Sequence, residues 1–175
     1  MRDIGLTFGE FRDIVCLMNI FFYEIEPIGV FSISANDDAI RGVAFGSENL
    51  SHSVYIEKET LLIQKAVTQL REYLSGKRLK FDLPLYHKGT DFQNKVWQAL
   101  LDIPYGETRS YKEIAEEVGS PRAFRAVGMA NHRNPLAFFV PCHRVIKSGG
   151  GLGGYAGGIH VKRFLLDLEK SIKFQ

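Results

Sequence analysis

This chain of 175 residues has little of several features that would assign it to a specialised class. Its two cysteines, Cys16 and Cys142, cannot build a disulfide framework, which favours a reducing compartment. No group of Cys, His and carboxylate residues has zinc-ligand spacing, so we expect no metal and no other cofactor. The apolar run IVCLMNIFF is too short to cross a bilayer and lacks the flanks of a secretory signal. We therefore expect a cytoplasmic protein without membrane contacts.

The overall composition is ordinary, but the charges are unevenly distributed. Hydrophobic residues make up 45% of the chain and charged residues 24%, which is usual for a globular protein. Residues 1–86 carry 9 Lys and Arg against 12 Asp and Glu, whereas residues 87–175 carry 13 against 8. This asymmetry is typical of a nucleic-acid-binding half joined to a neutral or acidic half, although a solvated surface can also produce it.

The first half has the pattern of several strands followed by one helix. Three short segments are rich in β-branched and aromatic residues and are separated by turn residues, which predicts an antiparallel meander. From residue 58 to residue 75 the apolar spacing becomes helical, and Gly76 ends this pattern. The predicted strands are residues 19–25, 28–34 and 40–46.

The segment DLPLYHKGT, residues 82–90, reads as a linker because it combines proline, glycine and polar residues. It divides the chain into an N-terminal scaffold domain (19–86), in which we find no catalytic cluster, and a C-terminal domain (87–175). Residues 1–18 form a leader segment whose role the sequence does not indicate.

Helix starts are strongly marked in the second half. TDFQ from Thr90 and SYKE from Ser110 both have capping-box spacing, and each precedes an apolar-periodic run. The second of these helices stops at Gly119. Ser120 then predicts the cap of a third helix, with Pro121 at its first position. Two short helices joined by a tight glycine turn indicate a helix-turn-helix.

The third helix, within residues 121–134, has two faces of different character. Phe124, Val127 and Ala130 follow helical spacing and are expected to face the core. The other stripe is mostly basic, which indicates a DNA-reading helix more than a merely solvated face. That stripe consists of Arg122, Arg125, Met129 and Arg133.

Small residues alternate along the same helix at Ala126, Gly128 and Ala130. Glycine inside a helix costs roughly 1 kcal/mol relative to alanine, and a close approach to another surface would justify that cost. Helix-turn-helix proteins usually read the wide major groove. A helix with so little side-chain volume could instead press into the narrower minor groove.

The segment PCHRV places Cys142 beside His143, after an apolar run and before the glycine-dense SGGGLGGYAGG. A free cysteine is most often a small buried hydrophobe. A nucleophilic cysteine instead needs a base or positive surroundings, because a thiol near its free pKa is only slightly ionised at neutral pH. Neighbouring side chains on extended backbone point to opposite faces, so a water bridging the two residues is a natural arrangement.

RAVGMANHRNP, FFVPCHRV and GGYAGG occur here in one order, and together they resemble the methylated-DNA–protein-cysteine methyltransferases, the 6-O-alkylguanine-DNA alkyltransferases. The resemblance begins near Met18 and is strongest from Phe92 to Glu169. It implies an α+β protein with an N-terminal ribonuclease-H-like domain, a short antiparallel sheet plus helix. It also implies a C-terminal winged helix-turn-helix domain that carries the reactive cysteine.

The resemblance further implies direct repair of double-stranded DNA, approached from the minor groove. The damaged base is flipped, and its 6-O-alkyl group, mainly methyl, moves irreversibly to Cys142. Alkylated thymine is a further candidate substrate. Each molecule acts once and is then inactive. It is expected to act as a monomer without an obligate protein partner.

The same resemblance assigns roles to individual residues. His143 activates Cys142 through a water, and Glu169 orients the imidazole. Tyr111 donates to a ring nitrogen of the base, and Asn134 braces the loop that carries the nucleophile. The guanine edge and the pocket wall involve Val145, Tyr155 and Ala156. Arg125 fills the gap left by the flipped nucleotide, and the remaining DNA-contacting residues are Arg122, Ala126, Gly128 and Met129.

Some positions depart from relatives, and two other functions remain open at this point. Ala156 stands where relatives often carry serine, and Asn131, His132 and Ala137 also differ from some of them, which leaves substrate size and inhibitor sensitivity open. One alternative is a non-enzymatic winged-helix protein that recognises lesions or regulates transcription. The other is a cysteine hydrolase, which the sequence adjacency of Cys142 and His143 disfavours. Phosphate binding by GGGLGG lacks the strand-to-helix context of a nucleotide loop.

Overall fold

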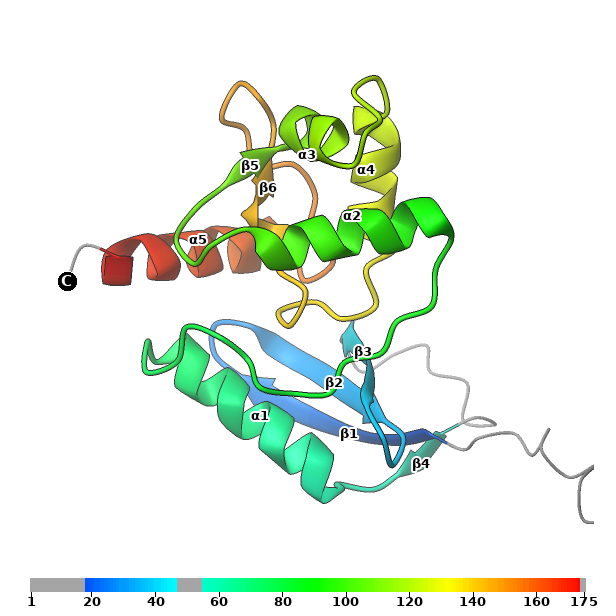
Figure 1. The fold of residues 1–175 in the computed structure, drawn as a ribbon. Helices are drawn as coiled ribbons and strands as arrows, with labels where there is room; N and C mark the ends of the chain where they lie inside the picture. The colour runs from blue at the N-terminus through cyan, green and yellow to red at the C-terminus, as the bar shows by residue number, and fades with distance from the viewer. Residues whose placement is uncertain (1–17, 47–54, 174–175) are drawn as a thin grey trace, which may run out of the picture.

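The computed structural model describes residues 18–46 and 55–173. The predictions for the leader segment, including Cys16, therefore fall outside the described residues, apart from Met18. In Figure 1 a small sheet with one helix lies below a group of helices and short strands. This is the mixed α+β architecture that the resemblance implies. Within the described ranges, no helix is long and apolar enough to span a membrane.

The N-terminal half folds into a four-stranded sheet with the order β3-β2-β1-β4. The first three strands pair antiparallel as the predicted meander. The fourth pairs parallel to β1, and the sequence does not predict it because three residues are too few for a recognisable alternation. The strands are β1 (Met18–Ile25), β2 (Gly29–Ala35), β3 (Ile40–Phe45) and β4 (Tyr55–Glu57).

Helix α1 (Leu61–Leu74) lies within the predicted helical range and packs against β2 and β3. Its first turn is closed by Thr60, whose side chain accepts a hydrogen bond from the backbone N–H of Ile63. Gly76 follows the helix with a φ of 74°, a left-handed conformation that glycine adopts without steric cost.

The C-terminal half contains the helix-turn-helix, and both predicted capping boxes are present, at Thr90 and Ser110. The indole N–H of Trp97, on the helix that Thr90 caps, donates to the carbonyl of Ala130 at 2.9 Å and joins this helix to the third helix of the C-terminal half. The elements are α2 (Asp91–Asp102), β5 (Arg109–Ser110), α3 (Tyr111–Glu117), α4 (Phe124–His132), the 3₁₀ turn η1 (Cys142–Arg144), β6 (Val145–Ile146) and α5 (Ile159–Lys173).

The start of α4 differs from the prediction. Ser120 does not cap this helix, which begins only at Phe124 after Ala123, without a side-chain cap. The backbone N–H of Ala123 instead bonds to the carbonyl of Ser120 at 2.8 Å, so the intervening residues form a turn. Phe124 is the first residue of α4, next to this turn, and at 46% exposure it does not face the core as predicted, whereas Val127 and Ala130 are buried as predicted.

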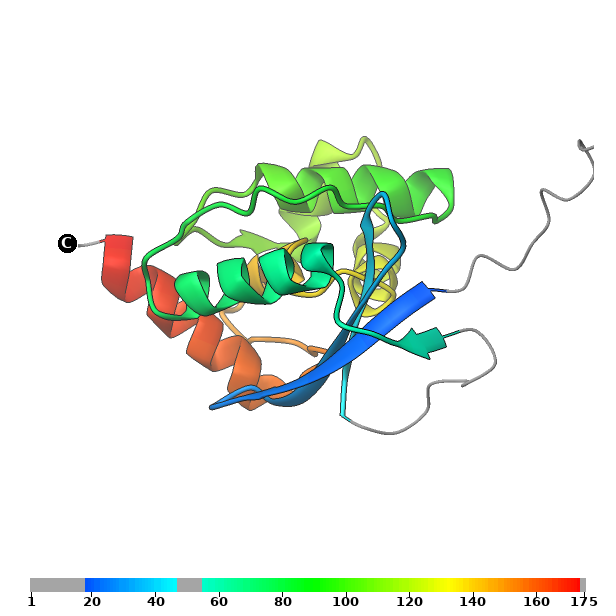
Figure 2. The ribbon, with the colours of Figure 1, turned by 90° about the horizontal axis from the view of Figure 1, so that it is seen from below.

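The two halves meet over buried aromatic rings. Phe138, in the loop before η1, packs edge-on against Phe31 and Phe45 of the sheet, with ring centroids 5.8 and 5.3 Å apart. The backbone N–H of Val43 also donates to the carbonyl of Pro135 at 2.7 Å. Phe138 has a φ of 71°, which costs a bulky residue about 1–3 kcal/mol, so its packing must hold the loop in this shape. In Figure 2, seen from below, the sheet and α1 lie in front of the C-terminal helices.

Two leucines of α1, one buried and one exposed, test how this helix packs against the core. Leu70 is completely buried, whereas Leu61 on the same helix is 85% exposed. Leu70→Ala should lower the free energy of unfolding by about 2–5 kcal/mol, because it removes buried methyl groups and leaves a cavity. Leu61→Ala should change it by less than about 0.5 kcal/mol. Denaturant unfolding of both variants measures the difference, and equal losses would contradict the packing described here.

Candidate active site

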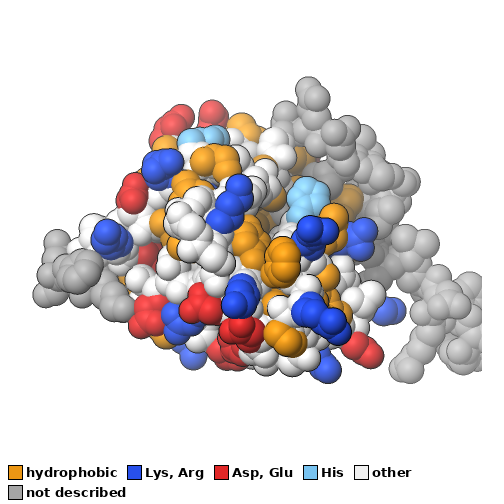
Figure 3. Space-filling model, turned by 90° about the horizontal axis from the view of Figure 1, so that it is seen from above, with side chains coloured by type: hydrophobic (Ala, Val, Ile, Leu, Met, Phe, Trp, Pro, Cys, Tyr) orange, Lys and Arg blue, Asp and Glu red, His pale blue; other side chains and the backbone are white. Residues whose placement is uncertain are grey.

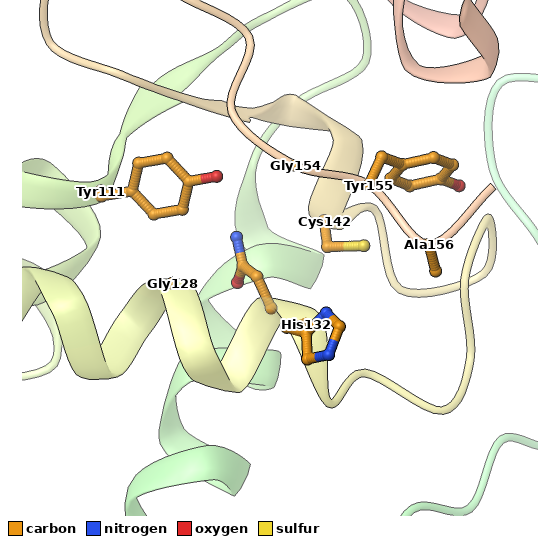
Figure 4. A pocket seen from close by; sticks show the side chains of 8 residues that line it. Tyr111, Gly128, His132, Cys142, Gly154, Tyr155 and Ala156 are labelled. Carbon is orange, nitrogen blue, oxygen red and sulfur yellow. The ribbon is translucent and has the colours of Figure 1, made fainter. Parts of the chain in front are cut away.

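Cys142 is the first residue of η1 and directly follows Pro141. Its side chain is only 7% exposed and borders a cavity of about 70 Å³. Figure 4 shows Tyr111 on one side of this cavity and Tyr155 on the other, with α4 beneath. Besides Cys142, the cavity is lined by Tyr111, Gly128, Asn131, His132, Gly154, Tyr155 and Ala156.

The surroundings of the Cys142 thiol act on its ionisation in opposite directions. Burial raises the pKa of the thiol, and a hydrogen bond from Asn134 and the charge of Lys162 lower it in part. Lys162 is itself fully buried, and its ammonium group donates to the carbonyl oxygen of Val145 at 2.7 Å. Burial lowers the pKa of Lys162 to about 8, so most of its charge is present at pH 7. Because the net shift for Cys142 is upward, the thiol needs a base before it can act as a nucleophile.

Asn134 lies where the loop to the nucleophile begins. Its Nδ2 donates to the carbonyl of Val140 at 2.8 Å, and its Oδ1 accepts from the backbone N–H of Leu136 at 3.0 Å. These two bonds close the loop that leads into Cys142. The family resemblance assigns to Asn134 the role of bracing this same loop.

His143 is completely buried behind the cysteine. Among the described residues no hydrogen bond joins it to Cys142, but the reason differs from the one expected. The backbone is a 3₁₀ turn and not extended, and about three residues per turn separate the two side chains by roughly 120°. The Nε2 atom of His143 lies 2.8 Å from Oε1 of Glu169, whereas its Nδ1 is buried without a partner in the described part of the chain. Burial lowers the pKa of His143, so the imidazole is neutral near pH 7.

Glu169, on α5, gathers donors from several segments. Arg144 binds both carboxylate oxygens through its Nε at 3.1 and 3.0 Å, and the backbone N–H of Gly106 donates to Oε2 at 2.8 Å. Burial alone would raise the pKa of Glu169, but the hydrogen bonds and charges of His143 and Arg144 lower it to about 2. Because His143 is neutral near pH 7, we assign the charge stabilisation to Arg144.

The prediction that the first half only provides a scaffold is wrong in one respect. The hydroxyl of Tyr73, on α1, donates to Oε1 of Glu169 and lies 3.2 Å from Nε2 of His143. All three side chains are buried. The sequence gives no sign of this contact, because Tyr73 is one of several apolar-face residues of its helix and lies far from the PCHRV segment along the chain.

The predicted base-contacting residues lie on two sides of the cavity. A Cβ atom at Gly153 would lie 2.5 Å from the hydroxyl oxygen of Tyr111, so only glycine permits this approach. Tyr155 packs edge-on against His143 and against Phe45 of the sheet, with ring centroids 6.3 and 5.8 Å apart. Ala156 lines the cavity, whereas Val145 is buried beside it with its carbonyl oxygen bound by Lys162.

The outer face of α4 exposes the predicted DNA-contacting residues Arg125, Ala126 and Met129, and Arg122 is exposed just before the helix. Gly128 lies apart from them and lines the cavity. Figure 3 looks down on this end of the molecule. Lys and Arg side chains are spread among hydrophobic ones across the middle of the view, while most Asp and Glu side chains lie towards its margins.

Two family models match this chain, one in each half. A sequence model described as "6-O-methylguanine DNA methyltransferase, DNA binding domain" matches residues 91–171. A second, described as "6-O-methylguanine DNA methyltransferase, ribonuclease-like domain", matches residues 22–86. The chain belongs to the 6-O-methylguanine DNA methyltransferase family.

Individual members of the family match over most of their length. A methylated-DNA–protein-cysteine methyltransferase of Methanosarcina barkeri is 47% identical over 154 residues, which cover 86% of this chain and 98% of that protein. Its counterpart in Methanosarcina mazei is 56% identical over 155 residues, with the same coverage. The crystal structure of Mycobacterium tuberculosis OGT in complex with DNA superimposes with a TM-score of 0.81 at 45% identity, covering 88% of this chain and 94% of that one.

Two charged residues of the site were not predicted. Arg144 belongs to the PCHRV segment, and Lys162 lies seven residues before Glu169 on α5. That spacing places Lys162 and Glu169 on the same face of the helix, among the buried residues Val161 and Leu165, and it could have indicated an inward-facing polar pair. Over residues 18–46 and 55–173, no cluster of His, Cys, Asp or Glu is arranged to hold a metal ion.

The depressed pKa of Glu169 predicts how stability depends on pH. The folded-state pKa of about 2 lies below the ordinary value of 4.5, so the stabilisation is present above pH 4.5 and is lost as the pH falls towards 2. Glu169→Gln should therefore be less stable than the wild type at pH 7 by an amount on the order of a few kcal/mol. This difference should shrink steadily below pH 4.5.

Thermal or denaturant unfolding across this pH range measures the effect. Asp167→Asn, at an exposed carboxylate on the same helix, provides the control and should follow the wild type. A stability difference for Glu169→Gln that stays constant down to pH 2 would contradict the low pKa.

Proposed function

We propose that this protein repairs alkylated DNA directly, by moving the alkyl group from 6-O-alkylguanine to Cys142 in a single irreversible turnover. The observation that carries the proposal is the placement of Cys142. Its thiol lies between two tyrosines in a cavity next to α4, with the buried His143–Glu169 pair behind it. The family names and the DNA complex of the M. tuberculosis relative support the same activity.

The transfer step uses groups that the site already positions. His143 accepts the thiol proton of Cys142 through an intervening water, because its Nδ1 is free to accept and faces no protein partner among the described residues. The sulfur forms a bond to the alkyl carbon while the bond between that carbon and the guanine oxygen breaks. The electron pair of the broken bond goes to the guanine, which takes up one proton in exchange for the one that Cys142 released, so that no net proton is gained or lost. Glu169 and Arg144 keep the imidazole in place throughout.

Groups around the cavity are suited to a base that carries both donors and acceptors. Tyr111 donates to a ring nitrogen, and burial together with the charge of Cys142 raises its pKa, so its hydroxyl stays protonated. Both amide atoms of Asn131 are buried without partners in the described structure, although the residue lines the cavity. An unpaired buried amide is costly, and a bound base would supply the missing hydrogen bonds. Tyr155 and the backbone at Ala156 complete the contacts at the cavity wall. The carbonyl oxygen of Val145 already accepts from Lys162, and its second lone pair is the one assigned to the base.

DNA binding is assigned to α4 and its flanks, with Arg122, Ala126 and Met129 against the minor groove and Gly128 at the cavity, where the flipped nucleotide would enter. Arg125 is exposed on this face and is suited to fill the gap that the flipped nucleotide leaves. We further propose that the protein acts as a cytoplasmic monomer. The division into units of residues 19–86 and 87–175 is supported by the ranges of the two family matches.

The first test concerns the nucleophile and turnover. A thioether has no acyl group that water could hydrolyse, so product formation with excess labelled 6-O-methylguanine duplex should stop near one equivalent per protein. Cys142→Ser should transfer no label and should retain folding and DNA affinity, because the thiolate contributes chemistry and little binding. Peptide mapping should place the label on Cys142. Label on Cys16, or product that accumulates well beyond one equivalent, would refute the proposal.

The second test concerns Arg125. Arg125→Ala should slow repair of duplex DNA at least tenfold more than reaction with the free base 6-O-methylguanine, since only the duplex requires the stack to be filled. Arg163→Ala, at an exposed arginine on α5, is the charge-matched control and should leave the ratio of the two rates unchanged. Equal losses on both substrates would place Arg125 in the pocket and not in the stack.

A further inference from the structure

Tyr73 connects the N-terminal half to the reacting groups. Its side chain is completely buried, and its hydroxyl contacts Oε1 of Glu169 and Nε2 of His143 at once. Its ring packs against Phe81 and Tyr105, with centroids 5.1 and 5.8 Å away, so the hydroxyl has little freedom to move. The sheet-bearing half of the molecule therefore reaches into the hydrogen-bond network of the site.

The number of protons in this network fixes the state of the imidazole. Burial raises the pKa of Tyr73 well above its ordinary value, so the hydroxyl keeps its single proton. The ionised Glu169 can only accept hydrogen bonds, and the Tyr73 hydroxyl directs its proton towards Glu169 as a hydrogen-bond donor. A lone pair of the tyrosine oxygen then faces Nε2 of His143. Both groups next to Nε2, the Glu169 carboxylate and the Tyr73 oxygen, accept a hydrogen bond from it. In the neutral imidazole Nε2 must therefore carry the hydrogen, and Nδ1 carries none.

We propose that Tyr73 is a positioning residue for alkyl transfer, which acts through Glu169 to keep His143 neutral, with its Nδ1 free to take the proton of Cys142. The inference rests on the proposed function, in which His143 is the base. Nδ1 is buried and unpartnered in the described part of the chain, as a position reserved for proton uptake requires. Tyr73 touches neither the thiol nor the cavity wall, so it acts only through the other two residues.

Charge sharing at Glu169 gives the direction of the effect. Each donor that binds a carboxylate weakens its attraction for the remaining donors, and removal of the tyrosine hydroxyl leaves more negative charge facing the imidazole. That charge favours the protonated imidazolium, which cannot act as a base. The titratable and charged groups that act on His143 or pack against it are Tyr73 from α1, Arg144 from η1, Lys162 and Glu169 from α5, and Tyr155 from the glycine-rich loop, and Cys142 precedes it in η1.

Tyr73→Phe removes the hydroxyl and keeps the ring, and Tyr23→Phe is its matched control. Tyr23 is also in the N-terminal half, and its hydroxyl donates to the carboxylate of Glu59 at 2.6 Å, away from the site. Both variants lose one tyrosine–carboxylate hydrogen bond, so a loss of stability affects both. Only Tyr73→Phe should change the chemistry of His143.

Two measurements on the full-length protein test the proposal. The first is the rate of transfer from methylated duplex DNA as a function of pH. The transfer rate of Tyr73→Phe should rise at a higher pH than that of the wild type. The rate should be lower by about tenfold near pH 6 and by about twofold or less near pH 9. DNA affinity should remain unchanged. Tyr23→Phe should keep the wild-type profile.

The second measurement is nuclear magnetic resonance of the His143 ring nitrogens, which requires no substrate. The wild type should show the form with hydrogen on Nε2, and Tyr73→Phe should titrate at higher pH. Hydrogen on Nδ1 in the wild type, or a Tyr73→Phe profile that superimposes on the wild type, would overturn the proposal. If the wild type transfers no alkyl group at any pH, the proposed function fails instead, and the nitrogen signals still report whether Tyr73 sets the state of His143.

Discussion

An ionised carboxylate in a protein interior must find its compensating donors and charges within the fold, because removal from water costs several kcal/mol per ion. Glu169 meets this requirement with the guanidinium of Arg144, the imidazole of His143, a backbone N–H at Gly106 and the hydroxyl of Tyr73. These groups come from three separate segments, since His143 and Arg144 both belong to η1, and the carboxylate is fully satisfied only when all three segments are in place. The last helix, the nucleophile turn and α1 are therefore fixed relative to one another by one side chain.

The thiol of Cys142 is held in a buried and mostly protonated form. Burial holds the Cys142 thiol mostly protonated, while Asn134 and Lys162 oppose that tendency. A thiolate is the form that reacts with oxidants as well as with alkyl groups. A mostly protonated, nearly inaccessible thiol is thus protected until a substrate enters, although a base must then remove its proton. For a protein that reacts once, protection of an unused thiol matters more than a fast return to the starting state.

The sequence was sufficient for features that depend on local rules. The capping boxes at Thr90 and Ser110 mark α2 and α3 correctly, because each involves residues three apart and no tertiary contact. Ser120 shows the limit of the same rule, since a suitable cap residue was present but the chain continued into a turn. The spacing of Lys162 and Glu169 along α5 could indicate that both side chains face inward, but not which groups they meet. Val145, the partner of Lys162, is 17 residues away, and Glu169, the partner of Tyr73, is 96 residues away, so no local pattern records either pairing.

The aromatic contact between the halves limits how the two halves can be separated or exchanged. A chain that starts after the linker would keep PCHRV, the helix-turn-helix and the glycine-rich loop, so inspection of motifs alone would count it as complete. It would nevertheless expose Phe138, whose left-handed backbone conformation is supported by Phe31 and Phe45 from the other half. Exchange of one half between relatives would have to preserve these ring contacts. The shape of the loop before the Cys142 turn therefore depends on residues of both halves, although only the C-terminal half carries the PCHRV motif. We expect the contacting rings of the two halves to change together in evolution.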